Sequence, residues 1–400
     1  MDRRKNHIGR RTVLLAAGGA VVLTALAQPT QAATITRQVS AGNEEPRIRA
    51  EQAEQAIVQR HVRTLWGQRE MLLGTLVWPS SLFDQSLVRW CYWWQAHLLD
   101  CAVDAAYRDR TPERVDRVAA IACGIRARNL TGWTNRYYDD MAWLALALER
   151  ADRLLDLRFS NAVGDLRAAL LEGWNPAVGA VPWRHGDDFY NTPAIGPTGI
   201  ALARSGELTR ARQLADFLHF RLRDPGSGLI LDGVHQPGGQ VEQNTHTYSQ
   251  GVAIGLETEL AVRTGEAHHH RRATALIAAV GDRLTTAGVI AGAAGDDSGL
   301  FMGILARYLA EAALALGDTT AASIVHASAR AAWAHRAEVD RLPLFGPDWT
   351  RPVTVEYPET VPPLPYSPAA TPTNFSRDLS VQLSGWMLLE ADHRLTAAGL

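Results

Sequence analysis

The sequence predicts an all-α protein built as an (α/α)6 toroid of six helical hairpins. Two observations lead to this fold class. Apolar residues recur at helical spacing along most of the chain, and short links alternate with long links between the helices. In a ring of antiparallel hairpins, this alternation places all short turns at one end and all long loops at the other. With 46% hydrophobic and 20% charged residues, the chain can also bury one large core.

Twelve helices are expected, and every even-numbered one starts after a long link and ends at a short one. These even-numbered helices are rich in small residues, as in "YSQGVAIGLETEL" from Tyr248, which suits a crowded inner ring. The last long link, 337–374, is rich in proline and is predicted to be an ordered loop packed on the long-loop end. In chain order, the helices are predicted over residues 48–66, 86–108, 112–128, 137–156, 159–172, 191–204, 207–221, 246–264, 267–286, 298–316, 319–336 and 375–394.

Residues 1–32 have the pattern of an export signal. Arg10 and Arg11 directly precede the apolar run "TVLLAAGGAVVLTALA", and "TQA" before Ala33 offers a cleavage site. The arginine pair resembles a twin-arginine signal, and the run is shorter than the roughly 20 residues that span a membrane. We therefore predict a secreted or cell-envelope-associated protein without stable membrane insertion, with an uncleaved N-terminal anchor as the alternative. A linker is expected over 33–47 and a single helical domain over 48–400.

Charge and cysteine content narrow the possible partners and covalent links. A formal net charge of −2 gives no electrostatic basis for binding nucleic acid, and we expect a monomer. Cys91 and Cys101 lie on one predicted helix, about 15 Å apart at 1.5 Å per residue, which is too far for a disulfide. Cys101 and Cys123 could face each other across a helical hairpin. We expect buried free thiols, with a disulfide between these two as the alternative.

Two neighbouring aspartates, Asp139 and Asp140, lie in "NRYYDDMAW" at the start of an apolar helix. Neighbouring side chains on a helix diverge by about 100°, so their carboxyl groups can lie roughly 5–6 Å apart. Retaining glycosidases place their two carboxyl groups about 5–5.5 Å apart, and inverting ones about 6.5–9.5 Å. The helix N-terminus would stabilise one carboxylate, and repulsion would raise the pKa of the other. The pair is therefore a candidate retaining catalytic pair, with helix capping at the surface as the alternative.

Other polar and aromatic residues are expected to gather at the same long-loop end. The helix starts "DDFYNTPA", "NTHTYSQG", "GDDSGLF" and "TNFSRD" are rich in Asp, Asn, Thr and Tyr. Aromatic rings stack on the apolar face of a sugar while polar groups bond its hydroxyls, so this composition predicts a glycan site. Capping of helices is the alternative for each residue taken singly. The loop tryptophans expected there are Trp78, Trp133, Trp174, Trp183 and Trp349, and the candidate contacts include Asn135, Tyr137, Tyr138 and Asp188.

The stretch "NRYYDDMAWLALAL" resembles the signature of glycoside hydrolase family 76, the endo-α-1,6-mannanases. The segments "YNTPAIGPTGIALAR", "GLILDGV", "TYSQGVAIGLETELAVRTGE" and "GLFMGILARYLAE" agree with the family in the same order. The resemblance covers about residues 50–390 and implies an (α/α)6 barrel.

The resemblance also implies a mechanism and a substrate. Asp139 would be the nucleophile and Asp140 the acid/base of a retaining reaction that needs no metal and no organic cofactor. The substrate would be an α-1,6-mannan-type polysaccharide or a glycolipid such as lipomannan. The residues that the resemblance places along the substrate groove are Asn191, Thr192, Asp232, Tyr248 and Gln250.

Three other interpretations remain open at this point. The chain could be a non-catalytic glycan-binding relative, or a toroidal hydrolase or lyase that acts on another polysaccharide. A prenyl- or terpene-type toroid would use the aspartates to hold Mg²⁺, but it usually requires a third carboxylate one helical turn away, and "MAWL" follows Asp140.

The run "HHHRR" from His268 to Arg272 suggests a metal site at first sight. Consecutive residues on a helix point in different directions, so three histidines in a row cannot all bind one ion. We therefore predict a solvated helix start there.

Overall fold

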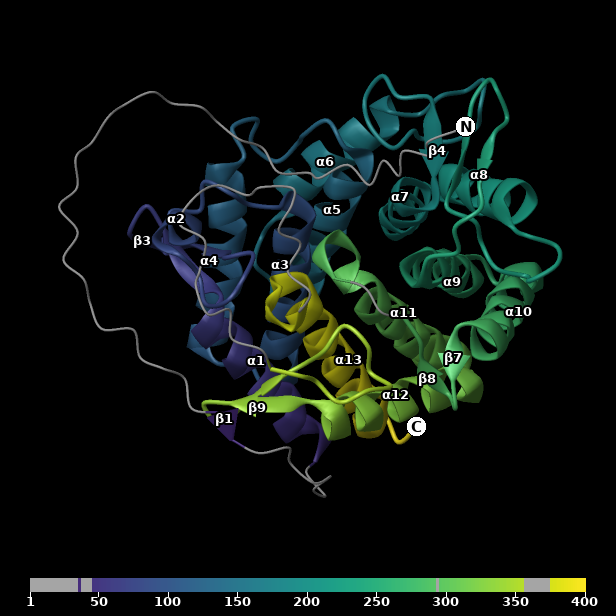
Figure 1. Ribbon diagram of the computed structural model, residues 1–400. Coiled ribbons are helices and arrows are strands. Elements are labelled where there is room, and N and C mark those ends of the chain that lie inside the picture. Colours follow the sequence, from purple (N-terminus) through teal and green to yellow (C-terminus); the bar gives the residue numbers. More distant parts are fainter. Residues whose placement is uncertain (1–34, 37–44, 293–294, 356–374) are drawn as a thin grey trace, which may run out of the picture.

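The helices form a closed ring in the computed structural model, which describes residues 35–36, 45–292, 295–355 and 375–400 (Figure 1). The predicted export signal, 1–32, lies outside the described residues, as do 356–374 of the proline-rich segment. Each inner helix contacts the next one around the ring, and α13 closes the ring against α3. The inner helices are α3 (Tyr92–Arg108), α5 (Tyr138–Leu155), α7 (Thr192–Arg204), α9 (Thr247–Thr264), α11 (Phe301–Leu316) and α13 (Leu379–Ala397).

A second set of helices lies outside this ring and pairs with the inner helices. These outer helices are α1 (Pro46–Arg60), α4 (Pro112–Arg128), α6 (Ser160–Glu172), α8 (Leu208–Phe217), α10 (Ala267–Arg283) and α12 (Thr319–His335). The short helix α2 (Leu82–Gln85) belongs to the loop that precedes α3. The predicted (α/α)6 toroid is confirmed, and the inner helices are the even-numbered ones of the prediction.

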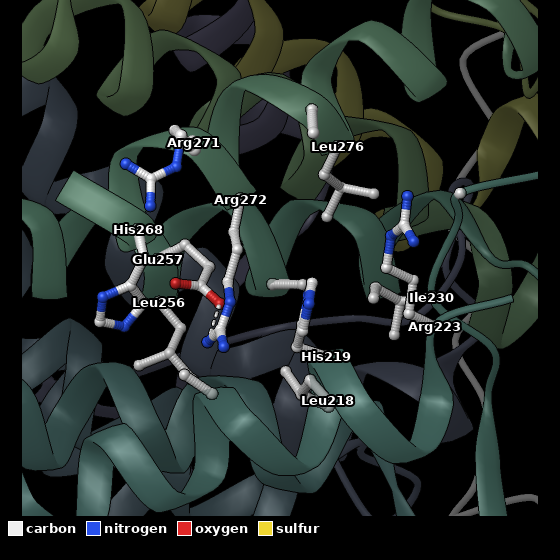
Figure 2. A pocket seen from close by; sticks show the side chains of 14 residues that line it. Leu218, His219, Arg223, Ile230, Leu256, Glu257, His268, Arg271, Arg272 and Leu276 are labelled. Carbon is white, nitrogen blue, oxygen red and sulfur yellow. Dashed lines mark hydrogen bonds and ion pairs between the residues drawn. The ribbon is translucent and has the colours of Figure 1, made fainter. Parts of the chain in front are cut away.

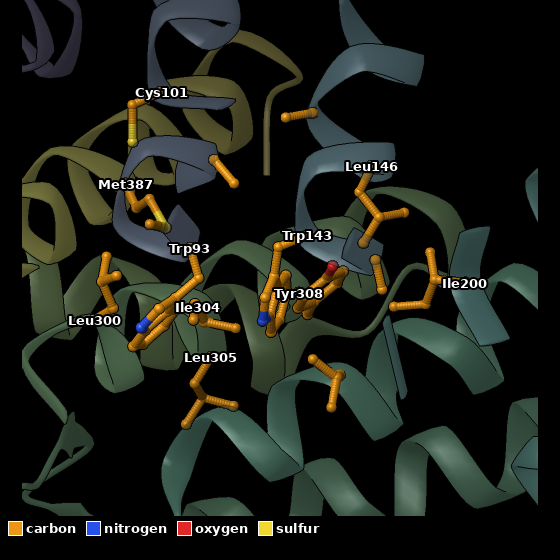
Figure 3. Packing of buried hydrophobic residues seen from close by; sticks show 14 of the residues in the cluster. Trp93, Cys101, Trp143, Leu146, Ile200, Leu300, Ile304, Leu305, Tyr308 and Met387 are labelled. Atoms are coloured by element: carbon orange, nitrogen blue, oxygen red, sulfur yellow. The ribbon is translucent and has the colours of Figure 1, made fainter. Parts of the chain in front are cut away.

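Small residues allow the inner helices to approach closely, as the sequence predicts. A Cβ atom added to Gly303 on α11 would lie 2.6 Å from the Cα of Ser384 on α13, which is closer than real Cβ contacts. A Cβ added to Gly251 on α9 would similarly lie 2.9 Å from the Cα of Leu305. Figure 3 shows large side chains of the buried cluster, including Trp93 from α3 and Trp143 from α5. Bulkier residues at the glycines would push the ring apart.

A buried ionic cluster also joins three inner helices. Asp100 and Asp104 on α3 form ion pairs with Arg150 on α5 and Arg307 on α11. All four residues are almost fully buried, so each charge depends on its partners for solvation. The cluster therefore fixes the relative positions of α3, α5 and α11.

Several short antiparallel strands interrupt the links, although the sequence shows no sustained strand alternation. The predicted first helix, 48–66, ends at Arg60, because the chain then forms a hairpin whose turn has positive φ at Trp66 (52°) and Gly67 (74°). The predicted helix 267–286 likewise ends at Arg283. The strands pair as β1 (Ile35–Thr36), β9 (Ala337–Val339) and β10 (Leu342–Leu344); β2 (Val62–Leu65) and β3 (Gln68–Gly74); β4 (Phe189–Asn191), β5 (Gly233–His235) and β6 (Val241–Glu242); and β7 (Thr285–Thr286) and β8 (Val289–Ile290).

Three of the helical segments are not purely α-helical. The predicted helix 207–221 continues from α8 into a π-helical turn, η1 (Leu218–Leu222). The 3₁₀ turns η2 (Asp296–Leu300) and η3 (Phe375–Arg377) precede α11 and α13. The predicted elements are therefore in place, with adjusted ends.

The cysteines are free, and the apolar helix α11 is buried. Cys91 and Cys101 are buried thiols as predicted, whereas Cys123 is exposed, which corrects the prediction for that residue. Among the described residues, one helix, Asp297–Leu316, is long and apolar enough to cross a membrane. Because 72% of its apolar window is buried, its composition is explained by its place in the inner ring.

Candidate active site

The start of α5 is held by the long loop between α6 and α7. The backbone N–H of Tyr138 donates to the carbonyl of Trp183 (2.9 Å), and that of His185 donates to the carbonyl of Arg136 (2.8 Å). Tyr137 and Arg184 also form an isolated β-bridge. This backbone pairing brings the loop tryptophan Trp183 against the two aspartates at the start of α5.

Asp139 receives hydrogen bonds on both carboxylate oxygens. The backbone N–H of Asp140 donates to Oδ1 (2.8 Å), and the indole Nε1–H of Trp183 donates to Oδ2 (3.1 Å). Asp139 also lies in the first turn of α5, where the positive end of the helix dipole favours an anion. Two N–H donors and a helix N-terminus together stabilise the ionised form of this carboxyl group.

Asp140 has a different set of neighbours. The side-chain amide of Asn135 donates to its Oδ2 (2.8 Å), and Oδ1 of Asn135 in turn accepts the backbone N–H of Tyr137 (2.8 Å). The Tyr92 phenol lies nearby, and its pKa is raised by burial and then by the negative charge of Asp140. The two neighbouring carboxyl groups therefore have distinct environments, as an acid and a nucleophile require.

Both aspartates are more buried than the sequence suggests. Helix capping at the surface, the alternative drawn from the sequence, would leave them exposed, but Asp139 is 1% exposed and Asp140 is 2% exposed. Trp183 and Asn135, which hydrogen-bond to them, come from loops whose position the helical pattern does not fix. The ring of Tyr137 packs edge-on against Trp183 at 5.3 Å between ring centres. Burial strengthens every charge interaction at this pair.

Asp232 is a third carboxyl group close to the pair. Burial raises its pKa to about 7, and the charges of Glu242 and Asp139 add to this effect. Its side chain is 18% exposed, and Oδ1 is buried without a hydrogen-bond partner among the described residues. The His246 ring lies beside this carboxyl group, with Nε2 4.0 Å from Oδ2, and burial lowers the pKa of the imidazole. Asp232 therefore combines a partly exposed side chain with one buried oxygen whose hydrogen-bonding capacity is unmet among the described residues.

Thr192 and Gln250 hold the segment that carries Asp232. The backbone N–H of Thr192 donates to the carbonyl of Asp232 (2.7 Å), and its hydroxyl donates to the carbonyl of Leu231 (2.7 Å). The amide of Gln250 bonds both the N–H and the carbonyl of Ile230, each at 2.8 Å. Both side chains are fully buried, so the prediction that they line a substrate groove is wrong, and their role is to position Asp232.

Of three other predicted contacts, Tyr138 and Asn191 are buried and Asp188 is exposed. Tyr138 is buried against α6, since a Cβ added to Gly173 would lie 2.3 Å from its ring, and its contact with a glycan stays a prediction. Asn191 precedes α7 with a buried Oδ1 that has no hydrogen-bond partner in the described chain. Asp188 is exposed and bonds to His235 at 3.0 Å, which lowers the pKa of the carboxyl group.

The remaining aromatic residues are distributed differently from the prediction. Tyr248 is half-buried and stacks on Phe301, with ring centres 3.8 Å apart and 9° between the planes. Trp133 is half-buried in the loop before α5. Trp349 is fully buried in the core, which corrects its prediction as a site residue. Among the five loop tryptophans, Trp183 is the one with a hydrogen bond to Asp139.

Four aromatic or imidazole groups at this end were not individually predicted as site residues. Tyr92 lies near Asp140, and the Nε1–H of Trp93 donates to Asp297 (3.1 Å). Phe301 packs with both Tyr248 and His246. The run "WCYWWQAH" was a usable signal for Tyr92 and Trp93, because the predicted helix that contains it begins after a long link.

An α-helical toroid with two adjacent carboxylates at the start of an inner helix, flanked by aromatic rings, has the features of a glycoside hydrolase. A family model, Glycosyl hydrolase family 76, matches residues 49–360. The chain belongs to this family, and the resemblance seen in the sequence is confirmed.

Solved structures have the same fold. The α-1,6-mannanase GH76A from Salegentibacter sp. HEL1_6 has a TM-score of 0.74 at 24% identity, over 88% of this chain and 100% of that chain. The Lin0763 protein from Listeria innocua has a TM-score of 0.75 at 23% identity, over 89% and 99%. A family 76 mannosidase from Bacteroides thetaiotaomicron VPI-5482 has a TM-score of 0.68 at 16% identity, over 89% and 100%. A search of curated proteins found no match.

Proposed function

We propose that this glycosidase is a retaining endo-α-1,6-mannosidase that cleaves the backbone of α-1,6-linked mannan or lipomannan. The observation that carries the proposal is the unequal bonding of the two adjacent aspartates. Asp139 has two N–H donors, whereas the side-chain amide of Asn135 donates to Asp140. The donors around Asp139 support its role as the ionised nucleophile, and the proposal assigns proton transfer to Asp140.

Relatives support the choice of substrate. The mannanase from Salegentibacter sp. HEL1_6 has been solved as an inactive variant, substituted at two consecutive aspartates, in complex with α-1,6-mannotetrose. A second inactive variant of the same enzyme was solved with α-1,6-mannotriose. This chain likewise has two consecutive aspartates, Asp139 and Asp140, at the start of α5.

The proposed reaction has two steps. Asp139 attacks the anomeric carbon while Asp140 gives its proton to the departing glycosidic oxygen, which leaves a glycosyl ester on Asp139. Asp140, now ionised, takes a proton from water as the water oxygen attacks the anomeric carbon. The ester bond breaks, Asp139 is regenerated, and the released sugar keeps its anomeric configuration.

Asp232 is assigned to substrate binding in this scheme. Its partly exposed carboxyl group accepts a sugar hydroxyl, and His246 lies beside its Oδ2. Because its pKa is raised to about 7, the ionised fraction of Asp232 increases as pH rises through neutrality. Tyr248 and Phe301 together supply a stacked aromatic pair for a sugar ring.

Export and oligomeric state belong to the same proposal. The basic and apolar N-terminal pattern supports secretion or envelope association through a twin-arginine-like signal. We further propose that the enzyme acts as a monomer, because the ring of helices contains the aspartate pair and its hydrogen-bond donors within one chain.

Product analysis tests the proposal. The wild-type enzyme should release oligosaccharides from linear α-1,6-mannan or from debranched lipomannan, and Asp140→Asn should release them at least about 100-fold more slowly. Asp165→Asn is the matched control, because Asp165 is exposed on the outer helix α6. Release of free mannose alone would contradict endo cleavage.

A binding experiment separates the main alternative. A non-catalytic glycan-binding relative would retain affinity for α-1,6-manno-oligosaccharides in the wild type without any turnover. Calorimetry with the same oligosaccharides therefore complements the product analysis.

A further inference from the structure

A cluster of possible metal ligands lies at the turn between α9 and α10. Glu266 immediately precedes α10, and His268 and His269 lie in its first turn. One ligand atom from each of the three residues lies within 4.8 Å of the other two. This turn is a short link, so the cluster lies at the end of the toroid opposite to the long loops that carry the aspartates.

The spacing of the ligand atoms is close to that of a tetrahedral site. Oε2 of Glu266 is 3.7 Å from Nε2 of His268 and 3.6 Å from Nε2 of His269. Ligands bound at 2.0–2.1 Å to a tetrahedral Zn²⁺ lie about 3.3–3.4 Å apart. A contraction of a few tenths of an ångström would therefore bring each of these pairs to binding distance.

Neighbouring residues orient two of the three ligands. Nδ1 of His269 bonds to the carboxylate of Glu257 at 2.5 Å, so a neutral ring carries its proton there and presents the Nε2 lone pair. His269 is 1% exposed, and its Nε2 has no hydrogen-bond partner in the described part of the chain. Arg212 donates to Oε1 of Glu266 at 2.6 Å, while Oε2 faces the histidines. A carboxylate behind a histidine is a common support for a metal ligand.

These contacts correct the prediction of a solvated helix start. His269 is buried, and its ring centre lies 3.9 Å from that of His268. The third consecutive histidine, His270, is exposed and is not part of the cluster. Two histidines and the preceding glutamate supply the ligands instead.

An adjacent pocket reaches one ligand of the cluster, His268. His268 and Glu257 line a cavity of about 360 Å³ between α8, α9 and α10, together with His219, Arg271 and Arg272 (Figure 2). The cavity leaves room for a water molecule as a fourth ligand. The two arginines disfavour cations held by charge alone, so the site suits metals that bind imidazole strongly.

We propose that Glu266, His268 and His269 bind a divalent transition-metal ion, with Zn²⁺ as the best match for two imidazoles and one carboxylate. Glu257 acts as a positioning residue through His269. The ion would fasten the turn between α9 and α10. This proposal does not depend on the catalytic assignment.

Zinc binding by tag-free protein tests the proposal. Calorimetry with Zn²⁺ alone should show one site per chain, and the melting temperature should rise with Zn²⁺ concentration. His268→Ala should reduce affinity at least tenfold, and it should fold normally because His268 is partly exposed. Glu257→Gln should weaken binding by roughly 10–100-fold without removing a ligand. His270→Ala is the matched control on the same helix and should bind Zn²⁺ like the wild type.

Two results would overturn the assignment. The first is the absence of stoichiometric Zn²⁺ binding by the wild type. The second is an equal loss of affinity in His268→Ala and His270→Ala, which would indicate general binding by surface histidines. His269→Gln provides a second ligand variant, with circular dichroism to verify its fold.

Discussion

Replacing Trp183 with Phe should slow catalysis without disturbing the fold. The indole Nε1–H donates to Oδ2 of Asp139 at 3.1 Å, and Phe keeps a ring against Tyr137 while removing that donor. A hydrogen bond to a charged group contributes about 1.5–3 kcal/mol. Each 1.4 kcal/mol is a factor of ten in rate, so kcat/KM should fall by roughly 10- to 150-fold. The backbone N–H of Asp140 still donates to Oδ1, which explains why activity is reduced and not abolished.

The assay is hydrolysis of α-1,6-manno-oligosaccharides, with circular dichroism to verify the fold. Trp174→Phe is the matched control, because Trp174 lies in the same loop and its Nε1 has no hydrogen-bond partner in the described chain. It should retain near-wild-type kcat/KM. If Trp183→Phe also turned over at the wild-type rate, the indole would not support the nucleophile.

Three further predictions concern proton transfer, pH dependence and packing. Asp140→Asn should lower kcat on mannan by roughly 10²–10⁴-fold, the usual contribution of a general acid. A substrate with a good leaving group needs less protonation, so its kcat should fall less. Rate measurements on both substrates would test this. Burial raises the pKa of Asp232 from 3.8 to about 7, so the folded state favours its neutral form. The resulting contribution to the free energy of unfolding is present below the unfolded pKa and is lost as pH rises toward 7. Asp232→Asn should flatten this decline, which chemical denaturation at several pH values would measure. An unchanged pH dependence in the variant would show that Asp232 is not the group responsible. Gly303→Ala should destabilise the protein by about 1–3 kcal/mol, because the added Cβ would lie 2.6 Å from Ser384. Gly164→Ala, on α6 with no atom within 4 Å, should stabilise it by up to about 1 kcal/mol, and equal melting temperatures for the two would contradict the packing argument.

The ring of helices could be predicted because it depends on local patterns. Link lengths and helical spacing identify which helices are inner, and the small residues in "YSQGVAIGLETEL" agree with them. The hairpin after α1 was missed, although Trp66 and Gly67 form a turn whose glycine is a recognisable signal. The periodic apolar residues before that turn continued the helical pattern past its true end at Arg60.

The candidate site was predictable in position but less so in detail. Asp139 and Asp140 are adjacent in the sequence, so their proximity is certain, whereas the Trp183 donor comes from a residue 44 positions away. Thr192 and Gln250 are residue types that often contact sugars. Their actual partners are backbone groups near Asp232, and that choice depends on how β5 approaches α7 and α9. Such long-range pairings determine burial, which a single sequence does not specify.

The stereochemistry of the first product tests the central claim most directly. Proton NMR during the early turnover of linear α-1,6-mannan by the wild type should show the α-anomer appearing before mutarotation, with no product from Asp139→Asn. Initial release of the β-anomer would contradict the retaining mechanism. Near-normal turnover by Asp139→Asn would remove Asp139 from the role of nucleophile.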